Sequence, residues 1–387
     1  MSHLQAVTYH TVTAISSKQW IELECANNAY FSPKFLKAFE VSNPNINFKY
    51  IVVNQNSSAI ALAIIQTIEL SVDVILKNIK LANWLKKLAH SLFCNNSMKI
   101  MTNGNIFLSG EHGLYIKEEA SKIKTLGTIA EAINNIAKHT KSLHAIVLKD
   151  FLKHSLKLTT HFENYGFTEM HVEPNLILEL DTNWKTFDDY KKDLKSKYRV
   201  KVNKADSSSN SLTARLFTEE DFATYKEELQ KLYENTIANA NFNAQVLNLD
   251  TYIHLREIYH DDFIVKAYFL ENKLVGFLSA LANNNHLDAH FIGLNYNLNR
   301  EHAIYPRILN DYVRIGLEKQ VSHINFGRTA SEIKTTIGAI PVDLTCYIKH
   351  KRPFMNRIIK FIIKRVKLKE FKQHHAFKTK KEATKAS

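Results

Sequence analysis

The chain has 387 residues and a mass of 44.6 kDa, which is long for one domain and comfortable for two. Charged residues make up 23% and hydrophobic residues 45%, which excludes globally disordered, collagen-like and coiled-coil classes. No apolar run approaches the roughly 20 residues that a spanning helix needs. The first Lys is Lys18, so we expect no signal peptide. Three widely spaced cysteines favour a reducing compartment over a disulfide framework.

The formal net charge of +13 is concentrated at the C-terminal end of the chain. Residues 349–387 contain fourteen Lys and Arg residues and two Glu residues, whereas the rest of the chain carries 37 basic and 36 acidic residues. Because the body is nearly neutral, contacts with anionic partners should begin at the tail. An RNA-binding function would therefore depend on this charge alone.

The first half of the chain alternates between helix and strand signals. β-Branched and aromatic residues predict a hairpin from 48–53 and 59–68. Further strands are expected at 105–108, 144–148 and 175–180. Helical spacing of apolar residues predicts helices at 123–137 and 152–165.

The second half has a clearer order of elements. It begins with a basic helix at 187–205 and ends with a strand at 342–348. The elements expected between them are a strand, two helices, three strands, a helix and a strand, at 212–217, 218–237, 250–259, 263–270, 274–281, 286–294, 305–319 and 323–326. This order resembles the middle of an acyl-CoA N-acyltransferase fold, and the first half repeats it more vaguely.

We therefore predict an α/β protein of the α+β type with two tandem domains of this fold and mixed, largely antiparallel sheets. The expected domains are 1–180 and 181–350, followed by a basic amphipathic helix and a disordered tail at 351–387. Phosphate-loop, dinucleotide-binding, serine-hydrolase and metalloprotease motifs do not occur in the sequence. The eighteen histidines are scattered, so we expect no metal site.

Strand 286–294 carries two titratable side chains among apolar ones. Period-2 alternation places Asp288, His290 and Ile292 on one face, where the first two can act as base and orienter or satisfy each other structurally. Gly293 suits a close approach of the backbone to a ligand. The helix starting near Tyr305 would aim free N–H groups at a pyrophosphate or carboxylate, or simply pack on the strand.

The segment 326–334 is the sharpest chemical signal in the sequence. A buried strand runs into a loop that offers Arg328 as an anion donor, Thr329 as a hydrogen-bonding partner, Glu332 as a base and Lys334 as a cation. The alternative is a solvated loop with an internal Arg–Glu ion pair.

These residues resemble a known family. The strand ending in FGR, followed by T-A-x-E-I-K, x-x-G-A-x-P and a Tyr-bearing strand, is similar to GNAT-type acyltransferases of the FemAB-like branch, which are bacterial proteins of peptidoglycan biosynthesis or recognition. The basic helix and the segment 274–280 also resemble that branch. The likeness is specific over 185–350 and architectural before that.

The resemblance implies transfer of an acyl group from acyl-CoA, or of an aminoacyl group from aminoacyl-tRNA, to an amine of a small-molecule or lipid-linked cell-envelope precursor. It places Arg328, Glu332 and Lys334 at the acceptor or donor pocket, and Tyr198 and Arg199 at the border of an interdomain cleft. Thr329, Gly293, Asn295 and Tyr305 complete the expected binding residues. Metal is not needed, and the base stays open between Glu332, His290 and Asp288.

One departure from the family pattern concerns the donor. The usual pyrophosphate loop of GNAT enzymes has several glycines, whereas 293–300 contains only Gly293. This departure favours a second function, a non-catalytic module that binds a glycan or lipid-linked ligand. The basic helix at 191–204 can meet phosphates of CoA, tRNA or lipid headgroups, or can be a solvated surface.

The tail has helical amphipathic spacing. Apolar residues between Met355 and Val366 alternate with a stripe formed by Arg357, Lys360, Lys364 and Lys367. Segment 354–368 is therefore expected to lie on an anionic membrane surface, to dock on the protein or to contact RNA. We expect a cytoplasmic protein, peripheral at the inner face of the membrane if the first reading holds.

Overall fold

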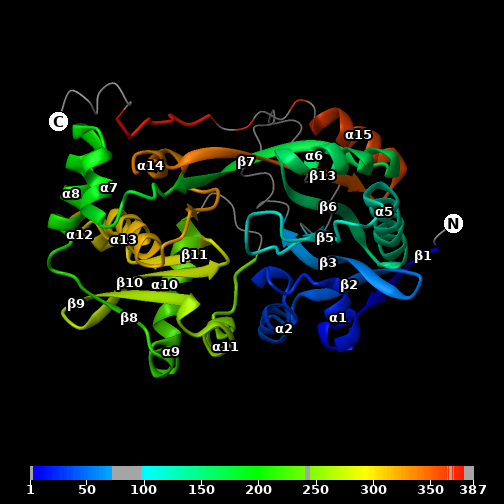
Figure 1. Ribbon diagram of the computed structural model, residues 1–387, viewed down its shortest axis with the longest axis horizontal. Helices are drawn as coiled ribbons and strands as arrows, with labels where there is room; N and C mark the ends of the chain where they lie inside the picture. Colours follow the sequence, from blue (N-terminus) through cyan, green and yellow to red (C-terminus); the bar gives the residue numbers. More distant parts are fainter. Residues whose placement is uncertain are drawn as a thin grey trace. The chain divides into compact units, whose positions relative to one another are not determined.

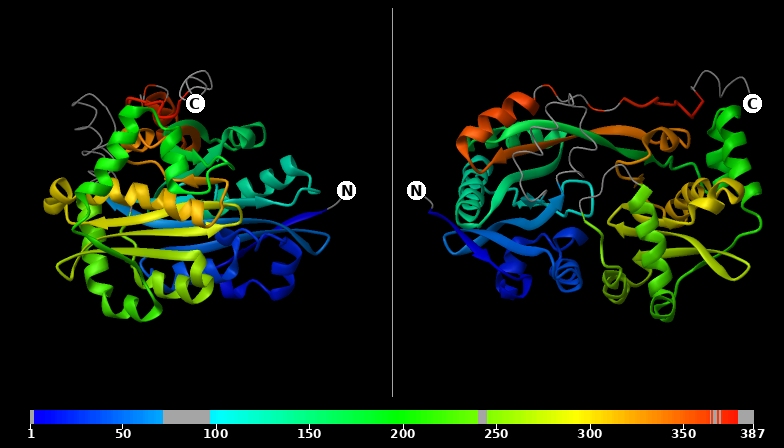
Figure 2. Two further views of the ribbon diagram at one scale, coloured as in Figure 1. Left: turned by 60° about the vertical axis from the view of Figure 1, so that its left-hand side comes forward. Right: turned by 180° about the vertical axis from the view of Figure 1, so that it is seen from behind.

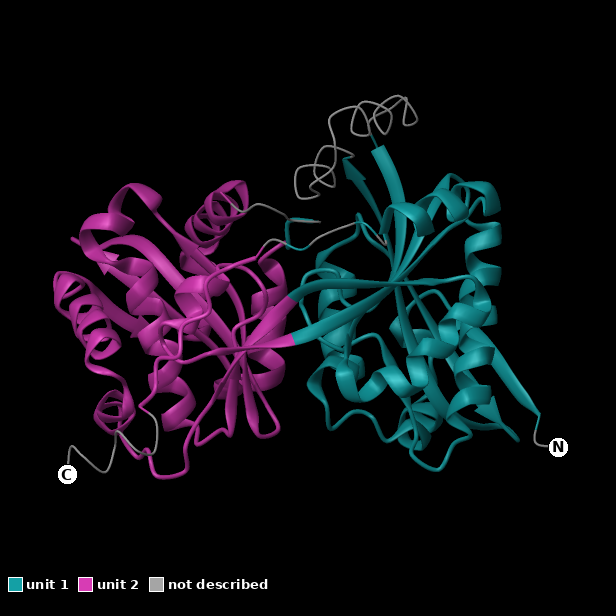
Figure 3. Cartoon of the chain, turned by 90° about the horizontal axis from the view of Figure 1, so that it is seen from above, with its two compact units in different colours: residues 1–173, 241–247, 343–369 teal, residues 174–240, 248–342, 370–387 magenta. Residues whose placement is uncertain are grey.

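A computed structural model describes residues 3–71, 97–239, 245–363, 365, 368 and 370–378. The chain forms two compact units (Figure 3): unit 1 contains 1–173, 241–247 and 343–369, and unit 2 contains 174–240, 248–342 and 370–387. The sequence placed a single boundary near Asp181. The division is different because each unit includes a strand from the other half of the chain.

Unit 1 is built on a mixed sheet (Figure 1). Its strand order is β1 (Leu4–Tyr9), β2 (Asn47–Gln55), β3 (Ser58–Ser71), β4 (Ser97–Asn103), β6 (Leu143–Leu152) and β13 (Ile340–His350), with β5 (Leu114–Ile116) beside β3. Strands β4 and β6 pair in parallel, and β13 returns from the end of the chain to pair antiparallel with β6. Asn56 and Ser57 have positive φ angles and form the predicted turn between β2 and β3.

The α-helices in the described part of unit 1 are α1 (Ser17–Leu23), α2 (Pro33–Ser42), α5 (Lys122–His139), α6 (Leu156–Thr159) and α15 (Pro353–Ile363). The predicted helix at 123–137 is confirmed as α5, which covers one face of the sheet (Figure 2). Its Leu126, Ile129 and Ile133 are fully buried against residues of β2 and β3 because they recur once per helical turn.

The end of β6 in unit 1 is covered by the chain itself. The strand expected at 105–108 is wrong, because 104–113 is a loop between β4 and β5. The Lys149 Nζ donates to the carbonyls of Asn105 and Leu108, each at 2.6 Å, and lies 3.0 Å from Asp150 Oδ2. These bonds tie the loop to β6 just beyond its pairing with β4, which ends at Asn103 and Leu148.

Unit 2 has a sheet in the order β7 (Thr168–Glu179), β12 (His323–Asn325), β11 (His286–Leu294), β10 (Lys273–Asn283), β9 (Phe263–Leu270) and β8 (Thr213–Leu216). Its helices are α7 (Phe187–Asp193), α8 (Ser196–Ser208), α9 (Glu219–Thr224), α10 (Lys226–Asn239), α11 (Asp250–Tyr259), α12 (Tyr296–His302), α13 (Ile304–Glu318) and α14 (Ser331–Thr335). The expected hairpin of β9 and β10 is confirmed, with Glu271 and Asn272 at positive φ in its turn.

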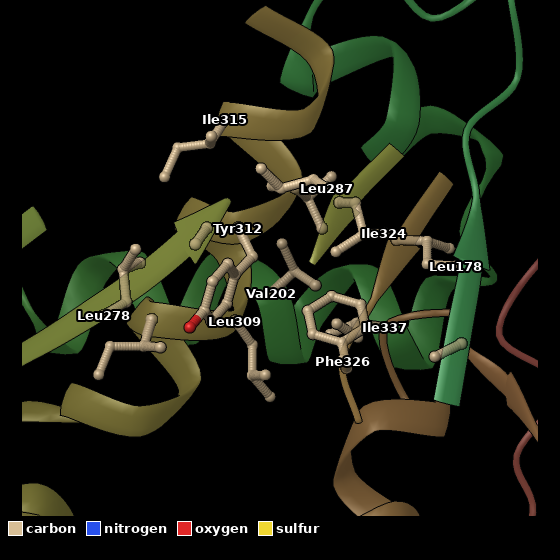
Figure 4. Packing of buried hydrophobic residues seen from close by; sticks show 14 of the residues in the cluster. Leu178, Val202, Leu278, Leu287, Leu309, Tyr312, Ile315, Ile324, Phe326 and Ile337 are labelled. Atoms are coloured by element: carbon tan, nitrogen blue, oxygen red, sulfur yellow. The ribbon is translucent and has the colours of Figure 1, made fainter. Parts of the chain in front are cut away.

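Two cores lie on opposite faces of β10 and β11. On one face, Tyr312 and Leu309 of α13 pack with Leu287, Ile324 and Phe326 (Figure 4). On the other face, aromatic residues of α9, α10 and α11 contact those of β9, β10 and β11, namely Phe222, Tyr233, Tyr252, Phe263, Phe277 and Phe291. No helix in the described ranges is both long and apolar enough to cross a membrane.

The C-terminal tail corrects two expectations. Residues 370–378 are ordered on unit 2, and Phe377 forms an antiparallel bridge with Leu194. The predicted single helix at 187–205 is instead α7 and α8, because Leu194 and Lys195 adopt extended backbone angles and Lys195 N donates to the carbonyl of Ala376 at 2.9 Å. Ala376 is buried in the core of unit 2.

Phe377 should be coupled energetically to Gly338. Its ring packs 5.2 Å from that of Trp184, and a Cβ on Gly338, whose φ is +98°, would lie 2.2 Å from it. Gly338→Ala should lower the free energy of unfolding by about 2–4 kcal/mol through this clash and the strained φ. In a double-mutant cycle measured by urea unfolding, Phe377→Ala should cancel much of that cost. If the effects of the two substitutions on the free energy of unfolding simply add, the tail does not pack against Gly338.

Candidate active site

The clearest candidate site in unit 2 is the place where β11 and β12 separate. These parallel strands share three paired positions, the last being Asp288 with Asn325. Beyond it, β12 stays with β7, because Phe326 N donates to Leu176 O and Leu176 N to Gly327 O. Residues 289–292 of β11 are only half-buried, between buried neighbours on both sides. We call the segments 289–292 and 326–328 the fork.

A β-bulge shapes the β11 side of the fork. Ser279 of β10 lies at the register shift, and its Oγ accepts a hydrogen bond from Phe291 N and donates one to Phe291 O, both at 3.0 Å. The hydroxyl of Tyr252 lies 2.7 Å from the same Oγ. The expectation that Asp288, His290 and Ile292 share a face is therefore wrong, since the bulge turns Ile292 toward the core that contains Leu287.

Asp288 closes the base of the fork. Its Oδ1 accepts from Asn325 Nδ2 at 3.0 Å, and its Oδ2 lies 3.1 Å from His286 Nε2. The His286 ring stacks on His323 at 5.0 Å. Burial alone would lower the pKa of His286, but its hydrogen bond to Asp288 raises it. Oδ1 of Asp288 therefore links β11 to β12, and Oδ2 is engaged by His286 of its own strand, which suits a positioning residue better than a base.

His290 lies within the bulge, among aromatic rings. Its ring is 6.3 Å from that of Phe263 and 6.1 Å from that of Phe291. Burial lowers the pKa of His290 to about 4, against the opposing effect of Asp288. The imidazole is therefore neutral at physiological pH and is a weak proton acceptor.

The residues at the far end of β11 serve the fold. A Cβ on Gly293 would lie 2.3 Å from Phe277 and 2.8 Å from the backbone of Leu232 in α10, so helix packing accounts for the missing side chain. Asn295 caps α12 by accepting from Asn297 N. Tyr305 N donates to Asn299 Oδ1 at 2.8 Å. The sequence did not predict α12, which stands between β11 and α13.

Lys334 reaches the other side of the fork. It belongs to α14, is 5% exposed, and its Nζ donates to the carbonyl of Phe326 at 2.6 Å. The Phe326 carbonyl can accept this hydrogen bond because Leu176 N donates to the following carbonyl, that of Gly327. Burial lowers the pKa of Lys334 to about 7. A primary amine that titrates near neutrality is the most strongly perturbed chemical group among the residues singled out by the sequence.

The loop before Lys334 brings some of the expected residues together. Arg328 is half-buried at the fork, whereas Thr329 and Glu332 are exposed. Ser331 Oγ donates to the carbonyl of Arg328 at 2.9 Å, which fixes the start of α14. The fork, Arg328 and Lys334 thus form one constellation, and Glu332, two residues before Lys334, is exposed on the surface of α14.

The tail links Glu332 to Tyr198. His374 Nε2 lies 3.4 Å from Glu332 Oε1, and its Nδ1 lies 3.2 Å from the Tyr198 hydroxyl. His374 N also donates to Thr335 Oγ1 at 3.0 Å. Arg199 follows on α8 and is half-buried. Sequence reasoning missed His374 because it lies in a basic, polar segment with no periodic apolar pattern.

Two other missed residues had a usable signal. Ser279 is the polar residue in the apolar stretch LVGFLSALA, and Asn325 stands between two apolar residues at a strand end. Such isolated polar residues in buried strands must find partners, which here are the bulge and Asp288. In the described part of the chain, no group of His, Cys, Asp and Glu is arranged to hold a metal ion.

No family model matches the chain, and neither does any curated protein. Solved structures do. FemX is 11% identical with a TM-score of 0.54, covering 92% of this chain and 100% of its own. The C-terminal domain of a putative lysylphosphatidylglycerol synthetase from Agrobacterium fabrum has 7% identity and a TM-score of 0.51, covering 92% and 97%.

A tandem GNAT protein from the clavulanic acid biosynthesis pathway is 10% identical with a TM-score of 0.51, covering 91% of this chain and 99% of its own. At such identities a likeness establishes architecture. The two units with similar strand orders agree with it. The chain therefore has the tandem GNAT fold, which it shares with FemX.

Proposed function

We propose that unit 2 transfers an acyl or aminoacyl group from an activated donor to an amine at the fork. The observation that carries this proposal is Lys334, a buried amine with a pKa of about 7, held on the carbonyl of Phe326 where β11 and β12 separate. The fold it shares with FemX, a putative lysylphosphatidylglycerol synthetase and a tandem GNAT protein supports the same class of reaction.

The reaction sets the demands on the site. The amine nitrogen bonds to the acyl carbon, the thioester or ester bond to the carrier breaks, the amine loses a proton, and the leaving group gains one. The tetrahedral intermediate carries an oxyanion that needs hydrogen-bond donors. The neutral amine of Lys334 has two N–H groups, one of which goes to Phe326 O, so the other can donate to that oxyanion.

The base is best assigned to Glu332. Asp288 has both oxygens engaged, and the lowered pKa of His290 makes it a weak acceptor. Glu332 is exposed on α14 two residues before Lys334, and its Oε1 makes only a long contact, 3.4 Å, with His374 Nε2. We propose that it accepts the proton of the incoming amine.

The donor site differs from the usual pyrophosphate loop. In the first turn of α13, Tyr305 N donates to Asn299, Pro306 has no N–H, and Arg307 N donates to Ala303 O. These groups are thus occupied by the chain itself and fit a pyrophosphate poorly. The exposed Lys197, Lys201 and Lys204 of α8 offer another surface for phosphates, which favours aminoacyl-tRNA over acyl-CoA as the donor.

The same poor fit supports a second candidate, a non-catalytic module that binds a glycan or lipid-linked ligand. One experiment separates the two. Purified protein is incubated with labelled acyl-CoA thioesters or labelled aminoacyl-tRNA and a panel of amine-bearing peptides and lipid-linked precursors, and labelled amide is measured. We expect product from aminoacyl-tRNA, and at least tenfold less with Glu332→Gln. Thermal stabilisation by an acceptor without product from any donor would favour the binding module.

A further inference from the structure

Helix α15 of unit 1 exposes an apolar stripe. Phe354, Ile358 and Phe361, at positions i, i+4 and i+7, are 71%, 37% and 60% exposed. Burying large side chains normally stabilises a fold by about 1.5–3 kcal/mol each. Three large apolar side chains exposed on one face of an 11-residue helix therefore indicate a binding surface. We call them the apolar stripe.

The rest of the helix fixes which way the apolar stripe points. Asn356 Nδ2 donates to Gly166 O at 2.9 Å, and its Oδ1 accepts from His350 N at 2.9 Å. Met355, Ile359 and Ile362 lie on the same side as Asn356 and are half-buried. With these contacts made, the helix cannot roll the apolar stripe inward without breaking both hydrogen bonds of Asn356. The stripe is thus a stable part of the surface.

Cations flank the apolar stripe. Residues 351–369 contain eight Lys and Arg residues and no Asp or Glu. Arg357 and Lys360 are exposed on the side of α15 next to the stripe. Arg365 covers the Phe361 ring, with its guanidinium carbon 3.4 Å from the ring centroid. This segment thus joins aromatic and aliphatic groups to positive charge, and its own sequence contains no acid.

We propose that α15 docks the protein on an anionic lipid bilayer. The apolar stripe would enter the boundary between headgroups and acyl chains, and Arg357 and Lys360 would meet lipid phosphates. Docking into an apolar protein groove would explain the exposed apolar side chains but not the uniform positive charge. Binding to RNA would explain the positive charge but not the exposed Phe354 and Ile358. Only a bilayer surface uses both. This proposal is independent of the transfer activity.

The test is co-sedimentation of the full chain with vesicles. Phosphatidylcholine vesicles containing about one third phosphatidylglycerol should bind it, whereas pure phosphatidylcholine should bind it at least tenfold more weakly. Binding to the anionic vesicles should fall steeply between about 0.05 and 0.5 M salt, because the Debye length shortens from roughly 14 to 4 Å. Phe354→Ser with Phe361→Ser, and Arg357→Glu with Lys360→Glu, should each weaken binding about tenfold or more.

Control variants on α1 and α2 test whether losing any exposed apolar side chain, or reversing any pair of charges, weakens vesicle binding. Ile21→Ser removes an apolar side chain that is 76% exposed on α1, and Lys34→Glu with Lys37→Glu makes the same charge change on α2. Both should bind vesicles like the wild type. Equal binding by the α15 variants and the wild type overturns the proposal. So does wild-type binding to tRNA, but not to anionic vesicles, at low salt.

Discussion

Replacing Asp311 with Asn should lower the free energy of unfolding by about 3–5 kcal/mol, because it leaves three partly buried cations without their buried partner. The Asp311 side chain is fully buried in α13. It lies 3.0 Å from Lys266 Nζ, 3.1 Å from Arg307 Nε and 2.6 Å from Arg314 Nη1. The hydroxyl of Tyr268 also donates to it, at 2.9 Å.

This network connects three elements of unit 2. Lys266 belongs to β9, and Arg314 continues from Asp311 to Asp206 of α8 at 2.6 Å. Losing the Asp311 charge therefore removes the ion pair that joins α13 to β9 through Lys266. It also weakens the ion pairs that join α13 to α8 through Arg314. Urea unfolding of the variant measures the loss. Asp188→Asn, at an exposed ion pair with Lys191 on α7, should change the free energy by no more than about 0.5 kcal/mol.

The pH dependence identifies the charge as the cause. Burial alone would raise the pKa of Asp311, but Lys266, Arg307 and Arg314 hold it below its ordinary value. A carboxylate with a lowered folded pKa stabilises the fold above its unfolded pKa of about 3.9 and stops doing so as the pH falls through the folded pKa. The difference between wild type and variant should therefore be constant from pH 5 to 8 and shrink below about pH 4. A difference that persists in acid would contradict the ionic explanation.

Lys334→Met should reveal a buried neutral amine through its pH dependence. In the unfolded chain a lysine stays protonated up to a pKa of about 10.4, whereas folded Lys334 loses its proton near pH 7. Between these values folding releases a proton, so this residue makes the wild type more stable as the pH rises. The stability of wild type minus that of Lys334→Met should increase by about 1.4 kcal/mol per pH unit from pH 7.5 to 9.5.

Comparing two variants with the wild type removes the titration of all other groups from the measurement. Lys37→Met, at an exposed lysine of α2, should give a difference that does not change with pH. A flat line for Lys334→Met would mean that Lys334 is charged in the folded protein throughout this range. That result would remove the perturbed amine on which the proposed chemistry depends.

The sequence predicted the second half of the fold well where local patterns decide it. The hairpin of β9 and β10, strand β11 and helix α13 have strong periodicity and turn residues, and all are confirmed. The first half was harder, because β1 and β4 were not expected and 105–108 was assigned wrongly. Which strands complete each unit depends on pairing between distant segments, such as β6 with β13, and a single sequence carries little information on that.

The sequence singled out residues of the candidate site but did not predict the role of each one. The loop carrying Arg328 and Lys334 was found from its residue types, because a charged run directly after a buried strand is unusual. Period-2 alternation cannot reveal the bulge at Ser279, so the grouping of Asp288 with Ile292 was wrong. Burial of Lys334 could not be predicted either, since its partner Phe326 is held in place by pairing with Leu176 of β7, a segment distant in the sequence.

The most direct test of transfer at the fork compares Lys334→Met with Lys349→Met in the labelled-amide assay. Lys349 of unit 1 is a matched control: it is half-buried, its pKa is lowered by burial, and its Nζ donates to Asn134 Oδ1 at 2.8 Å and Tyr165 O at 2.7 Å. If Lys334 stabilises the oxyanion, its variant should lose about 100-fold or more in kcat while remaining folded, and the control should keep near wild-type turnover. Unchanged turnover in folded Lys334→Met would contradict the proposed site.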